Sequence, residues 1–133
     1  MRNKSKNSRV SGLDVIDLGI TWDRLVAISD EIVSTLMRTS FSTIVSESYD
    51  LTVAILDRRG LLVAQGTKSL PVFMGTAPRT LQHFLRRYPA ESLKPGDIVI
   101  SNDPWVGTGH MFDINVMRPV FLENSIVAYT MSI

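Results

Sequence analysis

The sequence contains no cysteine, so disulfide bonds, thiolate zinc sites and a cysteine nucleophile are excluded within its 133 residues. Long apolar runs are also missing, because no stretch approaches the roughly 18 residues that a bilayer-spanning helix requires. The basic N-terminus is followed by no apolar segment, which excludes a secretory signal of the usual form. These absences favour a cytoplasmic protein with no membrane partner.

Positive charge is concentrated at the N-terminus. The chain has 14 Lys and Arg residues against 13 Asp and Glu residues. Four of the basic residues, Arg2, Lys4, Lys6 and Arg9, precede the first acidic residue, so the rest of the chain is mildly acidic. A short polar and basic end predicts a disordered tail, which we place at residues 1–18. No basic face interleaved with aromatic residues is visible, so nucleic-acid binding is not expected.

Apolar periodicity predicts two helices in an α+β fold. Apolar residues recur at three- and four-residue spacing over 20–48, which indicates a long helix with Thr21 as its N-cap. Hydroxyl and β-branched residues gather at 38–44, so we expect the helix to bend or end there. A second amphipathic helix is expected over 76–88, with Thr76 as its cap.

Short apolar runs bounded by turn residues predict mainly antiparallel strands. The expected strands are 51–57, 61–65, 98–100, 113–121 and 125–133. The first two are separated by Arg58-Arg59-Gly60 and form a β-hairpin. The last strand runs to the final residue without a turn or a cap, so we expect residues 19–133 to be an incomplete part of a larger fold.

The segment 101–113 holds the densest group of chemically capable side chains. His110 and Asp113 are an imidazole and a carboxylate three residues apart, and both are good ligands for a divalent metal of the Mn, Zn or Fe type. The same pair is also consistent with a hydrogen-bonded pair on the protein surface. Two ligands make only half of a zinc site, which normally has three or four protein ligands.

Four further residues of this segment are candidates for shaping a site. Gly107 and Gly109 permit positive φ angles and a close approach of the backbone to a ligand. Asn102 and Asp103 follow an apolar strand, where enzymes often place polar groups, although Asn-Asp-Pro is also an ordinary turn signal. Arg38 and Ser40, at the end of the first helix, are weaker candidates for lining a site. Their alternative role is to satisfy the helix terminus.

The order of several motifs carries more information than any one of them. The motifs are Arg38-Thr-Ser-Phe-Ser42, Asp57–Gln65, Leu93-Lys-Pro-Gly-Asp97, and Asn102-Asp-Pro-Trp105 through His110-x-x-Asp113. Together they resemble the N-terminal region of the hydantoinase B/oxoprolinase family, over about residues 20–133. That family includes N-methylhydantoinase B subunits, the matching half of 5-oxoprolinase, and subunits of acetone and acetophenone carboxylases. Its members are several times longer than this chain.

The resemblance implies a metal site and a partner. His110 and Asp113 correspond to metal ligands of the carboxylase relatives, a further histidine ligand would follow Ile133, and Asn102 and Asp103 would shape the loop or orient the ligands. A hydantoinase A-type ATPase subunit would use ATP to activate a small-molecule substrate, and the full-length protein would be a hetero-oligomer. The implied reaction is hydrolysis of a cyclic amide or imide such as hydantoin or 5-oxoproline.

Two alternatives remain open from the sequence. Trp105 and the order Gly107-Thr-Gly109 lean toward the branch that carboxylates small ketones. A non-catalytic interaction domain would use the same loop only as a structural element. Whether the whole protein is a hydrolase or a carboxylase, this chain alone is expected to be inactive.

Overall fold

The computed structural model describes residues 14–133 and confirms the α+β fold. The elements along the chain are α1 Val15–Thr39, α2 Thr43–Ser48, β1 Val53–Asp57, β2 Leu62–Gln65, α3 Phe73–Arg87, the short 3-10 helix η1 Ala90–Ser92, β3 Val99–Ser101, β4 Asn115–Leu122 and β5 Ser125–Ser132. All five expected strands are present, with small shifts of their ends. Residues 1–13 of the tail predicted at 1–18 lie outside the described residues. Within 14–133, no helix is both long and apolar enough to span a membrane.

The five strands form one antiparallel sheet in the order β2-β1-β5-β4-β3. β1 and β2 form the predicted hairpin, and β4 and β5 form a second one. β1 pairs with β5 from Val53 opposite Ser132 to Asp57 opposite Ala128. The ladder extends to Thr52, whose backbone amide donates to the carbonyl oxygen of Ile133 at 2.9 Å. The start of β1 therefore lies beside the end of β5.

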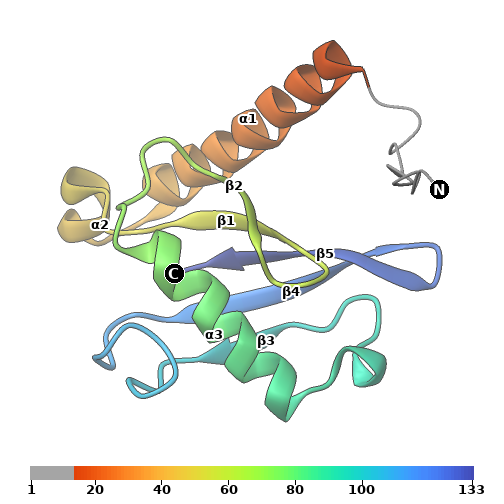
Figure 1. The fold of residues 1–133 in the computed structure, drawn as a ribbon. Coiled ribbons are helices and arrows are strands. Elements are labelled where there is room, and N and C mark those ends of the chain that lie inside the picture. The colour runs from red at the N-terminus through yellow and green to blue at the C-terminus, as the bar shows by residue number, and fades with distance from the viewer. Residues whose placement is uncertain (1–13) are drawn as a thin grey trace, which may run out of the picture.

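The two faces of the sheet pack against different helices (Figure 1). Alternate side chains of a strand point to opposite faces, so β1 contributes to both cores. The main core gathers the buried face of α3 and one face of the sheet, and its buried members are Ala54, Leu56, Ala77, Leu81, Phe84, Leu93, Met117, Tyr129 and Met131. On the other face, Val33 of α1 packs with Leu51 and Val53. The β1 side of the sheet thus lies between α1 and α3.

α1 begins earlier than the sequence predicts. Its first residue is Val15, with Asp14 as N-cap, so residues 15–18 belong to the helix and their assignment to a tail is wrong. Thr21 lies inside the helix, where its hydroxyl donates to the carbonyl oxygen of Asp17 at 2.8 Å. No proline separates 15–18 from the predicted start, so nothing in the backbone stops the helix at that point. The N-terminal half of α1 projects past the sheet in Figure 1.

The expected interruption of the long helix is confirmed at residues 40–42. Ser40 has an extended backbone and ends α1. Its side-chain oxygen accepts a hydrogen bond from the backbone amide of Ser42 at 3.1 Å, and Ser42 then caps α2. Serine side chains compete with helical hydrogen bonds in this way, which explains why the hydroxyl-rich segment divides the helix.

α3 also begins before its predicted cap. It starts at Phe73, and Thr76 lies in its first turn with its hydroxyl donating to the carbonyl oxygen of Val72 at 3.2 Å. Thr76 is therefore not the N-cap. The predicted buried stripe is correct, because Leu81 and Phe84 are buried in the main core and Leu85 packs against it.

Candidate active site

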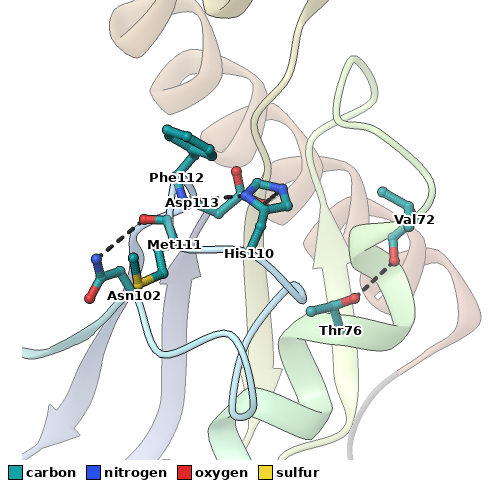
Figure 2. Close-up of polar contacts among 7 residues, drawn as sticks. All are labelled: Val72, Thr76, Asn102, His110, Met111, Phe112 and Asp113. Carbon is teal, nitrogen blue, oxygen red and sulfur yellow. Dashed lines mark hydrogen bonds and ion pairs between the residues drawn. The ribbon is translucent and has the colours of Figure 1, made fainter.

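The segment between β3 and β4 forms a loop that is closed by side-chain hydrogen bonds. The side-chain amide of Asn102 donates to the carbonyl oxygen of Met111 at 3.2 Å, which joins the two arms of the loop (Figure 2). The Asp103 carboxylate accepts the backbone amide of Trp105 at 2.9 Å and so fixes the first turn. The side chains of Asn102 and Asp103 therefore both form hydrogen bonds within the loop.

His110 and Asp113 meet at the end of this loop. Nε2 of His110 lies 3.3 Å from Oδ2 of Asp113, and Figure 2 shows the two side chains turned toward each other. The His110 side chain is about half exposed, whereas that of Asp113 is 18% exposed. The two ligand candidates are thus brought together at a surface that a small molecule can reach.

The other nitrogen of His110 is also occupied. The backbone amide of Phe112 donates to Nδ1 at 3.3 Å, so Nδ1 carries no proton in this arrangement. The ring proton then belongs on Nε2, where it faces Asp113. Among the described residues, the polar contacts of the imidazole are with Asp113 and Phe112 and not with Asn102 or Asp103. A direct orienting contact from Asn102 or Asp103 to His110 is therefore absent here.

The two glycines of the loop are needed for different reasons. Gly109 has a φ of 97°, a conformation that side-chain-bearing residues rarely adopt. Gly107 instead provides space, because a Cβ atom there would lie 2.5 Å from Nδ2 of Asn115. Asn115 is the first residue of β4 and only 1% exposed. Sequence reasoning missed Asn115, whose one signal is a polar residue at the start of an apolar strand.

The His110–Asp113 pair lies on the wall of a cavity of about 720 Å³. The cavity is formed where the α1–α2 junction, the start of β1, the end of the loop and the end of β5 come together. Small-molecule sites commonly have volumes of roughly 300–1,000 Å³. The pairing of β1 with β5 explains why residues so far apart in sequence share this cavity.

Of the two weaker candidates, Ser40 lines the cavity, and Arg38 is an exposed residue outside its lining. Asp50 is a lining residue that sequence reasoning left as ordinary polar flanking. Only the tertiary fold places Asp50, just before β1, beside a loop that follows much later in the chain. The cavity thus contains two carboxylates, those of Asp50 and Asp113, and one imidazole.

The donor pair fits a divalent metal in atom type and separation. In a tetrahedral zinc site with bonds of about 2.0–2.2 Å, neighbouring ligand atoms lie roughly 3.3–3.6 Å apart, and the His110–Asp113 separation is 3.3 Å. Among residues 14–133, however, no group of three or more His, Cys, Asp and Glu residues is close enough together to hold an ion. The described residues therefore provide two ligands and not a complete set.

Comparison with known proteins now assigns the fold and the loop to a family. Residues 14–133 match the family described as hydantoinase B/oxoprolinase. The chain belongs to that family. 5-Oxoprolinase 1 of Arabidopsis thaliana is 34% identical to this hydantoinase B/oxoprolinase chain over 119 residues, which cover 90% of the chain and 9% of the relative. The chain thus spans about a tenth of that relative.

Two solved structures share the fold of this hydantoinase B/oxoprolinase member. The ATP-dependent caprolactamase from Pseudomonas jessenii has a TM-score of 0.77 and 25% identity, with 90% of this chain and 20% of that chain covered. The nucleotide-free structure of acetone carboxylase has a TM-score of 0.75 and 20% identity, with coverages of 86% and 15%. The sequence-based resemblance is confirmed, and the described fold corresponds to part of these longer chains.

Proposed function

We propose that this chain is part of a catalytic subunit that opens the ring of a cyclic amide or imide in an ATP-dependent reaction. The observation that carries the proposal is the placement of the His110–Asp113 pair on the wall of a cavity of about 720 Å³. 5-Oxoproline and caprolactam, after which the Arabidopsis relative and the Pseudomonas jessenii structure are named, are both cyclic amides. The similarity of these two proteins to this chain supports a cyclic amide as its substrate.

His110 and Asp113 would hold a divalent metal of the Mn, Zn or Fe type, and such an ion would stabilise negative charge that develops on oxygen during amide cleavage. The 3.3 Å separation of Nε2 of His110 from Oδ2 of Asp113 would allow one ion to bind both atoms. Asp50 is the carboxylate of the cavity outside this pair. We assign it the role of accepting a proton from the attacking water.

In this proposal, a partner protein activates the substrate. A hydantoinase A-type ATPase subunit would transfer the γ-phosphoryl group of ATP to the amide oxygen of the ring. Water would then attack the activated carbon, and the ring C–N bond would break with a proton going to nitrogen, which leaves an acyl phosphate. A second water would hydrolyse the acyl phosphate to the carboxylate and inorganic phosphate. The active protein is accordingly a hetero-oligomer, and the 133-residue chain alone is expected to show no turnover.

The test combines the full-length subunit that contains this chain with a hydantoinase A-type ATPase, ATP and a panel of cyclic amides. Phosphate release and ring-opened product are measured together, and we expect them in equal amounts. His110→Ala should reduce turnover by about 100-fold or more, since loss of even an outer-shell partner of a metal ligand costs about 10–100-fold. His83→Ala should not reduce it, because His83 lies in α3 and contacts Arg86. Ring opening without ATP, or undiminished turnover in His110→Ala, would contradict the proposal.

A further inference from the structure

On the face of the sheet opposite α3, helix α1 covers only part of the strands. Among residues 14–133, α1 packs mainly against β1 and β2. These two strands lie at the end of the strand order that is farthest from β3 (Figure 1). The surface of β4 and β3 that faces away from α3 is therefore the part of the sheet without a helix partner in the described chain.

This surface of β4 and β3 is apolar. Successive side chains of a strand alternate between the two faces, and Met117 and Val99 pack in the main core. Val116, Val120 and Ile100 therefore point to the outer face. Ile100 is directly opposite Val116 in the ladder, and Ile100 is 63% exposed. Neighbouring apolar side chains on two strands form a patch of the kind that marks an interaction surface.

Helix α1 provides a second apolar surface at right angles to this patch. Ile28, Ile32 and Leu36 are four residues apart, so they form one stripe along the helix, and all three are partly exposed. Ile32 borders a hollow of about 490 Å³ together with Val120 of β4 and Thr130 of β5. The stripe and the outer face of β4 and β3 are thus the wall and the floor of one groove, which we call the α1–β3 groove.

The α1–β3 groove has the width of one helix. Neighbouring strands lie about 4.8 Å apart, so the axes of β5 and β3 are about 10 Å apart across β4. A helix with its side chains is about 10–12 Å in diameter, and packed helices lie about 8–10 Å from each other. One amphipathic helix beside α1 would bury both the patch and the stripe, and would complete a layer of helices on this face of the sheet.

The relatives indicate where such a helix comes from. The matched part is 20% of the caprolactamase chain and 15% of the acetone carboxylase chain, so most of each related chain lies outside the shared fold. An apolar surface of this kind is typical of contacts within a fold or a permanent complex. We infer that a helix of the full-length subunit, from outside residues 1–133, packs in the α1–β3 groove. This inference does not depend on the metal or on the reaction.

The test is site-specific photocross-linking in the full-length subunit that contains this chain. The photoreactive residue p-benzoylphenylalanine is placed at position 100 or, in a second protein, at position 120. The control position is 61, because Leu61 is 55% exposed and lies next to β2 at the opposite edge of the sheet. Mass spectrometry identifies the joined peptides, and a mixture of ¹⁴N- and ¹⁵N-labelled subunits separates links within one chain from links between two chains.

We expect positions 100 and 120 to be joined to one segment of the same chain outside 1–133. The joined residues of that segment should be three or four apart, as on one face of a helix. Position 61 should not reach this segment. Links from positions 100 and 120 to a second copy of the subunit or to the ATPase partner, or the absence of any protein link at both positions, would overturn the inference.

A pair of variants at one position provides a second measurement. If a helix covers Ile100, Ile100→Asp places a carboxylate where water cannot solvate it. The thermal midpoint of the full-length subunit should then fall by about 5 °C or more in Ile100→Asp, and by about 2 °C or less in Ile100→Val. Equal midpoints for the two variants would mean that Ile100 stays in water and would also overturn the inference.

Discussion

The backbone amide of Phe112 donates a hydrogen bond to Nδ1 of His110 at 3.3 Å. A metal bound at Nε2 would require the ring proton to move to Nδ1, so this bond would be lost. We therefore expect the amide resonance of Phe112 to shift when zinc is titrated into ¹⁵N-labelled protein. In His110→Ala, the same titration should leave that resonance in place. A zinc-dependent shift of Phe112 that persists in the alanine variant would show that the ion binds elsewhere.

Gly107→Ala should destabilise the protein. The new Cβ would lie 2.5 Å from Nδ2 of the buried Asn115, so either the loop or Asn115 has to move. Overpacking of this kind costs about 1–3 kcal/mol of unfolding free energy. Urea unfolding measures the change. Gly75→Ala is the control, since Gly75 lies in α3 and an added methyl group there would meet no atom within 4 Å, and it should stabilise by about 0.5–1 kcal/mol.

Asp30 connects α1 to the segment after β2. Its carboxylate accepts hydrogen bonds from the backbone amide of Thr67 at 2.6 Å and from the Thr67 hydroxyl at 2.9 Å. Asp30→Ala removes a charged acceptor and should lower the free energy of unfolding by about 1–3 kcal/mol. Asp23→Ala on the exposed side of the same helix should change it by less than about 0.5 kcal/mol. Equal effects of the two variants in urea unfolding would mean that this contact contributes nothing.

The raised pKa of Tyr129 predicts that the folded protein loses stability in alkaline solution. Burial in the main core raises the pKa of its phenol above the ordinary value of 10.0, and the nearby charge of Glu91 raises it further. Above about pH 10 the unfolded chain releases the phenolic proton while the folded chain keeps it, so unfolding becomes more favourable as pH rises. Unfolding free energies at about pH 8 and about pH 10.5 should therefore differ less in Tyr129→Phe than in wild type. An identical difference in both proteins would exclude Tyr129 as the cause.

The sequence predicted the elements with strong patterns and missed what depends on distant contacts. The hairpin over 51–65 and the amphipathic face of α3 have local signals, and both are confirmed. The predicted starts of α1 and α3 are less accurate, because both helices begin earlier in the chain. Thr21 and Thr76 are residue types that favour N-caps, yet both lie within helices and donate to backbone carbonyl oxygens of the preceding turn.

In the candidate site, too, contacts between residues close in sequence could be predicted and contacts between distant residues could not. His110 and Asp113 are close in sequence, so their meeting could be predicted from the loop alone. Asp50 could not be placed, because it joins the cavity only through the pairing of β1 with β5. The space requirement at Gly107 likewise depends on the buried amide of Asn115 in the next strand, which no local pattern indicates.

The central claim is that His110 and Asp113 bind a divalent metal, and isothermal titration of zinc into the full-length subunit that contains this 133-residue chain tests it most directly. Wild-type protein should bind one equivalent, and His110→Ala should weaken binding by about tenfold or more. His83→Ala should match wild type, because it removes the other histidine of the chain and leaves the pair intact. Zinc affinity that is unchanged in His110→Ala, or no binding by wild-type protein, would contradict the account.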